Sequence, residues 1–182
     1  MLSALLYSGS AAASVVEALS LSELVKRSEH VVLATAGERM GRRSGNLIVT
    51  DVQLRIEEAL KGGTQPGDTL IATLLGGVSE GVGLKVPGEA VLPEGSKIVV
   101  FLRRTPHSKE LRVVGMAQGA LPVEQRDGKP IVLPPAEHAE LMRRGPDGHL
   151  KESEGAVSAQ LALPDLLSRI RSLVASLAPA AR

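Results

Sequence analysis

Residues 47–57 constrain the fold most, because apolar and polar side chains alternate along this segment. Ile48 and Val52 fall on one face of an extended chain, whereas Asp51 and Gln53 fall on the other. A period of two is typical of an antiparallel strand with one face in the core and the other in water. The sequence therefore predicts a half-buried β-strand as the basic unit of the fold.

Further short apolar segments recur between residues 20 and 133, separated by turn-forming residues. The segments expected to form strands are 31–35, 68–75, 81–86, 97–103, 111–116, 121–124 and 130–133. Asp127-Gly128, between the last two, is a two-residue hairpin signal. The loops are too short for the crossover helices of a parallel sheet. We therefore expect a mainly β domain over residues 20–133, either an OB-like barrel or a small antiparallel sandwich.

The N-terminal segment carries two signals. Ser20 and Glu23 form the S-x-x-E pattern of a capping box, which predicts that a short helix begins there. Residues 1–19 resemble the second half of a secretory signal, with small residues that allow cleavage after Ala13. No basic segment precedes them, so a disordered apolar tail is the alternative interpretation. Met1 would then be the true start, and the protein would be cytoplasmic.

The C-terminal region is expected to contain a loop and a helix. Residues 134–157 combine Pro, Gly and charge with little periodicity, which predicts an irregular loop. Residues 158–182 follow helical spacing and place Leu166, Ile170 and Leu173 on one apolar stripe. We expect this stripe to pack on the β core, or to bind a partner if it lies outside.

The composition argues against several classes of function. The formal net charge is +1 and only two residues are aromatic, Tyr7 and Phe101. This pattern lacks the basic surface and the stacking platform of nucleic-acid binders. The chain has no Cys, which excludes disulfides and thiolate metal sites. No apolar run reaches the roughly 20 residues that span a bilayer. We expect no cofactor, no metal, no nucleic-acid partner and no transmembrane segment.

Ser79 is the one candidate nucleophile. Residues 77–81 match G-x-S-x-G, which in α/β-hydrolases presents the serine on a turn between a strand and a helix. The residues that follow include Gly83, Pro87 and Gly88, which do not favour a helix. A glycine-rich turn is therefore the expected structure, and a serine hydrolase is kept as an alternative.

Two further polar features stand out. Arg39, Arg42 and Arg43 lie in residues 37–45, which are expected to form a solvated loop where they could contact an anion. Together with Ser79 and the glycine-rich segment 76–83, they are candidate ligand-binding residues, for an oligosaccharide in particular. Gln118 lies between two predicted strands and is a residue type that fixes turns.

The order of these segments resembles known β-domains over residues 20–133. The residues that carry the resemblance are Ser20–Val25, Val31-Val32, Thr50–Val52, Glu58–Gly62, Gly76-Gly77, Val86–Glu89, Phe101–Arg103 and Val113–Gly119. They resemble uncharacterised bacterial secreted or envelope β-domains. At fold level they are similar to the netrin-like domains of tissue metalloproteinase inhibitors, which are OB-type barrels. Those inhibitors chelate the protease metal through an N-terminal Cys, so their mechanism does not transfer to a chain without Cys.

These observations predict a non-enzymatic, exported interaction or structural module that binds a protein partner in the periplasm, the envelope or the extracellular space. The alternatives are an OB-type oligosaccharide binder and, third, a serine hydrolase that uses Ser79.

Overall fold

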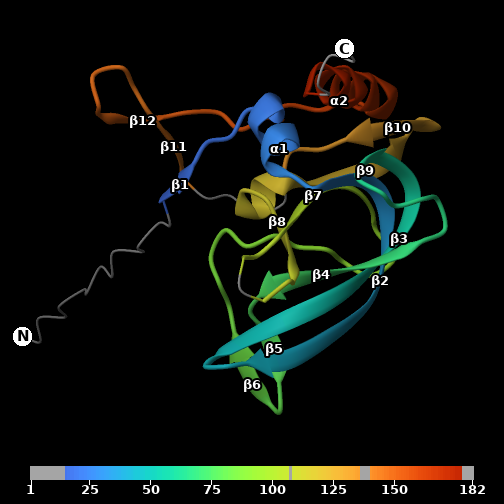
Figure 1. Cartoon of the computed structure of the whole chain (residues 1–182), viewed down its shortest axis with the longest axis vertical. Helices are drawn as coiled ribbons and strands as arrows, with labels where there is room; N and C mark the ends of the chain where they lie inside the picture. Colours follow the sequence, from blue (N-terminus) through green and yellow to red (C-terminus); the bar gives the residue numbers. More distant parts are fainter. Residues whose placement is uncertain (1–14, 107, 136–139, 178–182) are drawn as a thin grey trace, which may run out of the picture.

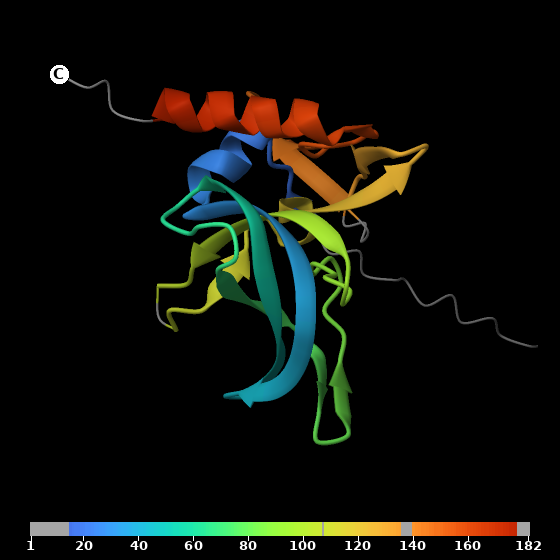
Figure 2. The ribbon, with the colours of Figure 1, turned by 90° about the vertical axis from the view of Figure 1, so that its right-hand side faces the viewer.

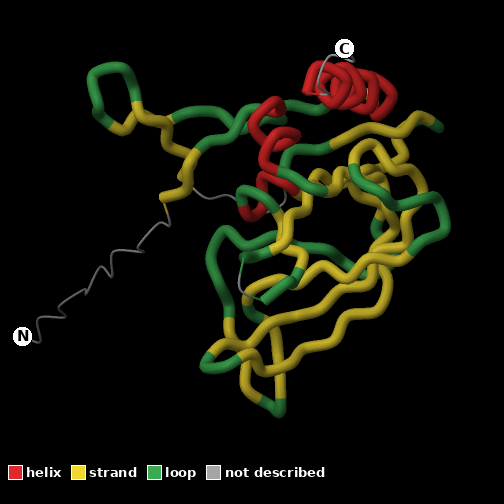
Figure 3. The backbone as a smooth tube through the Cα atoms, viewed as in Figure 1, coloured by secondary structure: helices red, strands yellow, loops and turns green. Residues whose placement is uncertain are grey.

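The protein is mainly β, with two α-helices in the part of the chain that the structure describes (Figure 1). A computed structural model describes residues 15–106, 108–135 and 140–177. The strands of its main sheet are β2 (His30–Ser44), β3 (Leu47–Lys61), β4 (Thr69–Leu75), β7 (Lys97–Arg104), β8 (Leu111–Val113), β9 (Ala120–Arg126), β10 (Lys129–Val132) and β13 (Leu161–Ala162). The expected strand-rich composition is confirmed, and strands dominate the backbone trace in Figure 3.

Four of these strands form a Greek key. β2, β3 and β4 pair in sequence, and β7 returns to pair with the free side of β2, all antiparallel. β8 then pairs antiparallel with β7 and, through Ala72 and Leu111, in parallel with β4. The predicted hairpin at Asp127-Gly128 is confirmed, since β9 and β10 pair across it.

Two hairpins project from one end of the molecule. Residues 37–45 were expected to form a loop, but β2 continues to Ser44 and pairs with β3 as far as Leu47. The prediction was wrong because backbone pairing with β3 stabilises the strand even where its side chains are polar. β5 (Gly77–Ser79) and β6 (Val82–Leu84) form a second hairpin beside it (Figure 2).

A small sheet replaces much of the loop expected at residues 134–157. β11 (Glu140–Arg144) pairs antiparallel with β12 (Leu150–Glu152) and in parallel with β1 (Val15–Glu17). A parallel partner more than a hundred residues away in sequence leaves no signal in the local pattern, which explains the difference from the expectation. The cleavage region predicted around Ala13 lies outside the described residues.

Helices cover one side of the main sheet (Figure 2). α1 (Leu21–Arg27) begins with the predicted capping box, in which the Glu23 N–H donates to Ser20 Oγ and the Ser20 N–H donates to the Glu23 carboxylate. α2 (Leu163–Leu177) confirms the predicted C-terminal helix. Phe101 packs in the core between these helices and the sheet. A 3-10 helix, η1 (Met116–Gly119), joins β8 to β9. Within the described ranges, no helix combines the length and the apolar character needed to cross a membrane.

Candidate functional site

The three predicted arginines lie on one strand but have different surroundings. Side chains alternate along β2, so Arg42 faces away from Arg39 and Arg43. Arg42 donates from Nε to Asp51 at 2.6 Å and from Nη2 to Glu110 at 2.8 Å. The strand therefore divides the arginines between two faces instead of collecting them into one anion site.

The face of Arg42 carries a connected network of charges. The Thr73 hydroxyl donates to Asp51 at 2.7 Å, and Arg112 donates to Glu110 at 3.0 Å. Hydrogen bonds from Arg42, and then from Arg112, lower the pKa of Glu110 to about 2, although burial acts in the opposite direction. Two carboxylates thus compensate the charge of Arg42, which weakens its attraction for a free anion.

A shallow groove of about 320 Å³ follows this network. Strands β3 and β4 contribute Asp51, Ile71 and Thr73, and the segment between β7 and β8 contributes Ser108 and Lys109. Met40 and Gln53 line a smaller hollow that shares Asp51 and Ile71 with the groove. We call this surface the outer-face groove. Its carboxylates, hydroxyls and half-exposed apolar side chains can bind a ligand rich in hydroxyl groups.

Ser79 lies on β5, where its side chain is buried. The chain then turns through Glu80, which has a φ of 52°, and Gly81, and continues as strand β6. The G-x-S-x-G pattern therefore forms the turn-and-strand geometry that its glycines predict, not the strand–turn–helix of a hydrolase. Within the described ranges, no hydrogen bond joins the Ser79 hydroxyl to a histidine.

Close backbone packing fixes the β5–β6 hairpin on the β2–β3 hairpin. A Cβ atom at Gly41 would collide with the backbone of Val78, and one at Gly77 would collide with the hydroxyl of Thr50. That hydroxyl donates to the Gly76 carbonyl at 2.8 Å. Only glycine permits this approach, so these positions determine where the second hairpin lies.

The ends of the two hairpins expose apolar side chains. We call residues 39–48 and 77–84 the paired-hairpin tip. Val78 is 67 % exposed and Val82 is 49 % exposed. Glu80, at the turn of the second hairpin, pairs with Arg43 of β2 at 3.1 Å. Val78 is paired with Gly83 and Val82 with Ser79, so the two valines lie on opposite faces of the second hairpin. The tip thus presents separate exposed apolar side chains on a fixed scaffold, beside charged groups.

The apolar stripe of α2 faces inward. Leu166 and Ile170 are 1 % and 0 % exposed, and they pack in the same cluster as Phe101. Leu173 is partly buried against that cluster. The stripe therefore packs on the core, the first of the two expected placements, and leaves Leu166 and Ile170 no exposed face for a partner.

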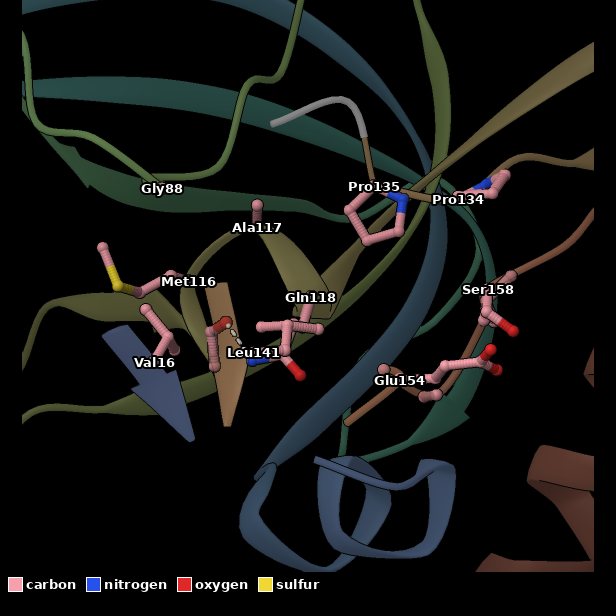
Figure 4. Close-up of a pocket in the computed structure, with 14 residues that line it drawn as sticks. Val16, Gly88, Met116, Ala117, Gln118, Pro134, Pro135, Leu141, Glu154 and Ser158 are labelled. Carbon is pink, nitrogen blue, oxygen red and sulfur yellow. Dashed lines mark hydrogen bonds between the residues drawn. The ribbon is translucent and has the colours of Figure 1, made fainter. Parts of the chain in front are cut away.

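A pocket of about 220 Å³ lies between the small sheet and the main body. In Figure 4, Val16, Met116 and Leu141 lie on one side of it, and Pro135 and Glu154 lie on the other. Local sequence patterns do not predict this pocket, because its walls come from segments that pair with strands distant in sequence.

Gln118 lies at the junction of these walls and is almost completely buried. Its Nε2 donates to the Gly115 carbonyl, which confirms the expected role in fixing a turn. Nε2 also donates to the Glu17 carbonyl at 2.9 Å, and Oε1 accepts from the Leu19 N–H at 2.9 Å. The side chain therefore holds the segment after β1 against η1.

Comparisons with protein-family models, with curated proteins and with solved structures find no match. A search of the described ranges also finds no group of three or more acidic or histidine side chains that could hold a metal ion.

Proposed function

We propose that this chain is a non-enzymatic interaction module and that the paired-hairpin tip is its contact surface for a protein partner. The observation that carries the proposal is that a second hairpin is fixed in place by glycines, yet exposes Val78 and Val82 to solvent. Neither valine contributes to the core clusters.

The rigidity of the hairpin supports this role. Val78 and Val82 lie on opposite faces of the β5–β6 hairpin, so a partner that contacts both would surround its end. A surface that is already fixed loses less conformational entropy when a partner binds. The pair Arg43–Glu80 supplies a polar border of the kind that surrounds the apolar centre of protein interfaces.

We further propose that the protein is exported and that its β domain is OB-like. The described residues begin at Val15, so cleavage after Ala13 would leave all of them in the mature chain. OB-type folds are five-stranded, partly open Greek-key barrels. The order β7-β2-β3-β4, with β8 paired to both β7 and β4, supports that interpretation.

The test uses two double variants of the full chain as bait in an extract of the cell that makes it. Val78→Ser with Val82→Ser alters the tip, and Val91→Ser with Leu150→Ser alters other exposed apolar positions. All four side chains are exposed enough that stability should change by no more than about 0.5 kcal/mol for each substitution. A partner retained by the wild type and the second variant, but lost with the first, supports the proposal. Equal retention by both variants contradicts it.

The outer-face groove supports a second candidate, an OB-type oligosaccharide binder. In OB-type barrels the second and third strands and adjoining loops bind such ligands. Here β3, β4 and the segment between β7 and β8 line the groove. Titration with a chito-oligosaccharide should give saturable binding that Ile71→Ala weakens and Val91→Ala leaves unchanged. Absence of saturable binding excludes this candidate.

A further inference from the structure

The pocket beside Gln118 has no part in either surface proposed above. Its walls come from β1, β11, η1 and residues 154–158, whereas the paired-hairpin tip projects from another part of the molecule (Figures 1 and 4). A site here would therefore act independently of the tip.

The size and lining of the pocket define the kind of group that fits. A dry apolar cavity of about 150 Å³ is enough to hold benzene. This pocket measures about 220 Å³, which suits a phenyl or branched aliphatic group better than a larger ligand. Most of the lining is apolar and includes Val16, Met116, Leu141 and Ala156.

The polar groups indicate the charge of that ligand. Glu154 is the only ionisable residue among the described residues that line the pocket, and it is exposed. Gln118 Oε1 accepts one hydrogen bond, from the Leu19 N–H, and a carbonyl oxygen can accept two. Both groups favour a ligand that donates hydrogen bonds, and the negative charge of Glu154 favours a cationic donor such as an ammonium group.

We propose that this pocket binds a small apolar group linked to an amine. The apolar body lies among Val16, Met116 and Leu141, and the ammonium group lies near Glu154. Because one wall belongs to the small sheet and another to η1, the ligand contacts both parts and stabilises the attachment of β1 and β11 to the main body.

The test titrates the full chain with benzylamine, benzyl alcohol and benzoate, which share one ring and differ in charge. Binding is followed by NMR signals of the side chains of Val16, Met116, Leu141 and Ala156. We expect saturable shifts with benzylamine, binding of benzyl alcohol that is about two- to fivefold weaker, and still weaker binding of benzoate. Saturable shifts with none of the three compounds would overturn the proposal, and benzoate binding as tightly as benzylamine would overturn the assignment of an amine.

Variants locate the site. Val16→Phe fills the pocket and should abolish the shifts, and Ala156→Leu is a second filling variant should the first fail to fold. Glu154→Gln should make benzylamine bind no more tightly than benzyl alcohol, whereas Glu152→Gln, on β12 and outside the pocket lining, should change nothing. Undiminished benzylamine binding in a folded Val16→Phe or Ala156→Leu protein contradicts this location.

Discussion

Gln118 shows at the scale of one residue how a buried polar group can join distant parts of a chain. Hydrogen bonds of its side-chain amide reach Glu17 and Leu19, roughly a hundred residues earlier in the sequence. A buried backbone group without a hydrogen-bond partner lowers the stability of the fold. Gln118 therefore stabilises the protein by pairing these backbone groups as well as by packing in the core.

Replacing Gln118 with Met should therefore lower the free energy of unfolding by about 2–4 kcal/mol, because the Leu19 N–H and the Glu17 carbonyl both lose a partner. Chemical denaturation measures the change. Gln125→Met, at an exposed position of β9, is the matched control and should cost no more than about 0.5 kcal/mol. Equal effects of the two substitutions would contradict this account of Gln118.

Glu110 gives a prediction about pH. Its pKa is lowered to about 2 in the folded protein, mainly by Arg42, so the ionised form stabilises the fold above the pKa of the unfolded chain. That contribution, about 1–3 kcal/mol, should be lost as the pH falls from about 5 towards 2. Glu110→Gln should lower stability at neutral pH and flatten this acid dependence. Glu124→Gln, at an exposed ion pair, should leave the pH curve unchanged.

At the scale of elements, the position of the β5–β6 hairpin depends on glycine. Gly41→Ala should displace this hairpin and cost about 1–3 kcal/mol, because the new methyl group overlaps the backbone of Val78. Hydrogen exchange of the amides of residues 77–84 should become faster. Gly63→Ala, where a Cβ atom meets nothing, is the control. Unchanged exchange in Gly41→Ala would mean that the hairpin is not fixed in the way described.

The helix α2 gives a second test at this scale. Ile170→Ala should cost about 2–5 kcal/mol in chemical denaturation, because the side chain is completely buried in the core. Leu177→Ala, half-exposed near the end of the same helix, should cost less than about 1 kcal/mol. Similar losses at both positions would contradict the inward orientation of the stripe.

Sequence patterns predicted the elements whose signals are local. The alternation along residues 47–57, the Ser20–Glu23 capping box and the stripe of α2 each correspond to an element of the structure. They did not predict the extension of β2 or the pairing of β1 with β11, because those strands are stabilised by distant backbone partners. The pocket was missed for the same reason, since its walls meet only once β1 and β11 have paired.

The whole molecule combines a packed core under two helices with a projecting tip that contributes little to that core. α1 and α2 cover the sheet at one end of the molecule, and the two hairpins project from the opposite end (Figure 2). This division supports the central proposal, because the tip can contact a partner while the core remains unchanged.

The most direct test places a photo-crosslinking amino acid at position 78 of the full chain in the cell that makes it. The same amino acid at position 150, exposed on β12, is the control. We predict a discrete protein adduct from position 78 and none from position 150. An adduct at position 150 without one at position 78, or no adduct at position 78 at all, would contradict the assignment of the paired-hairpin tip as the contact surface.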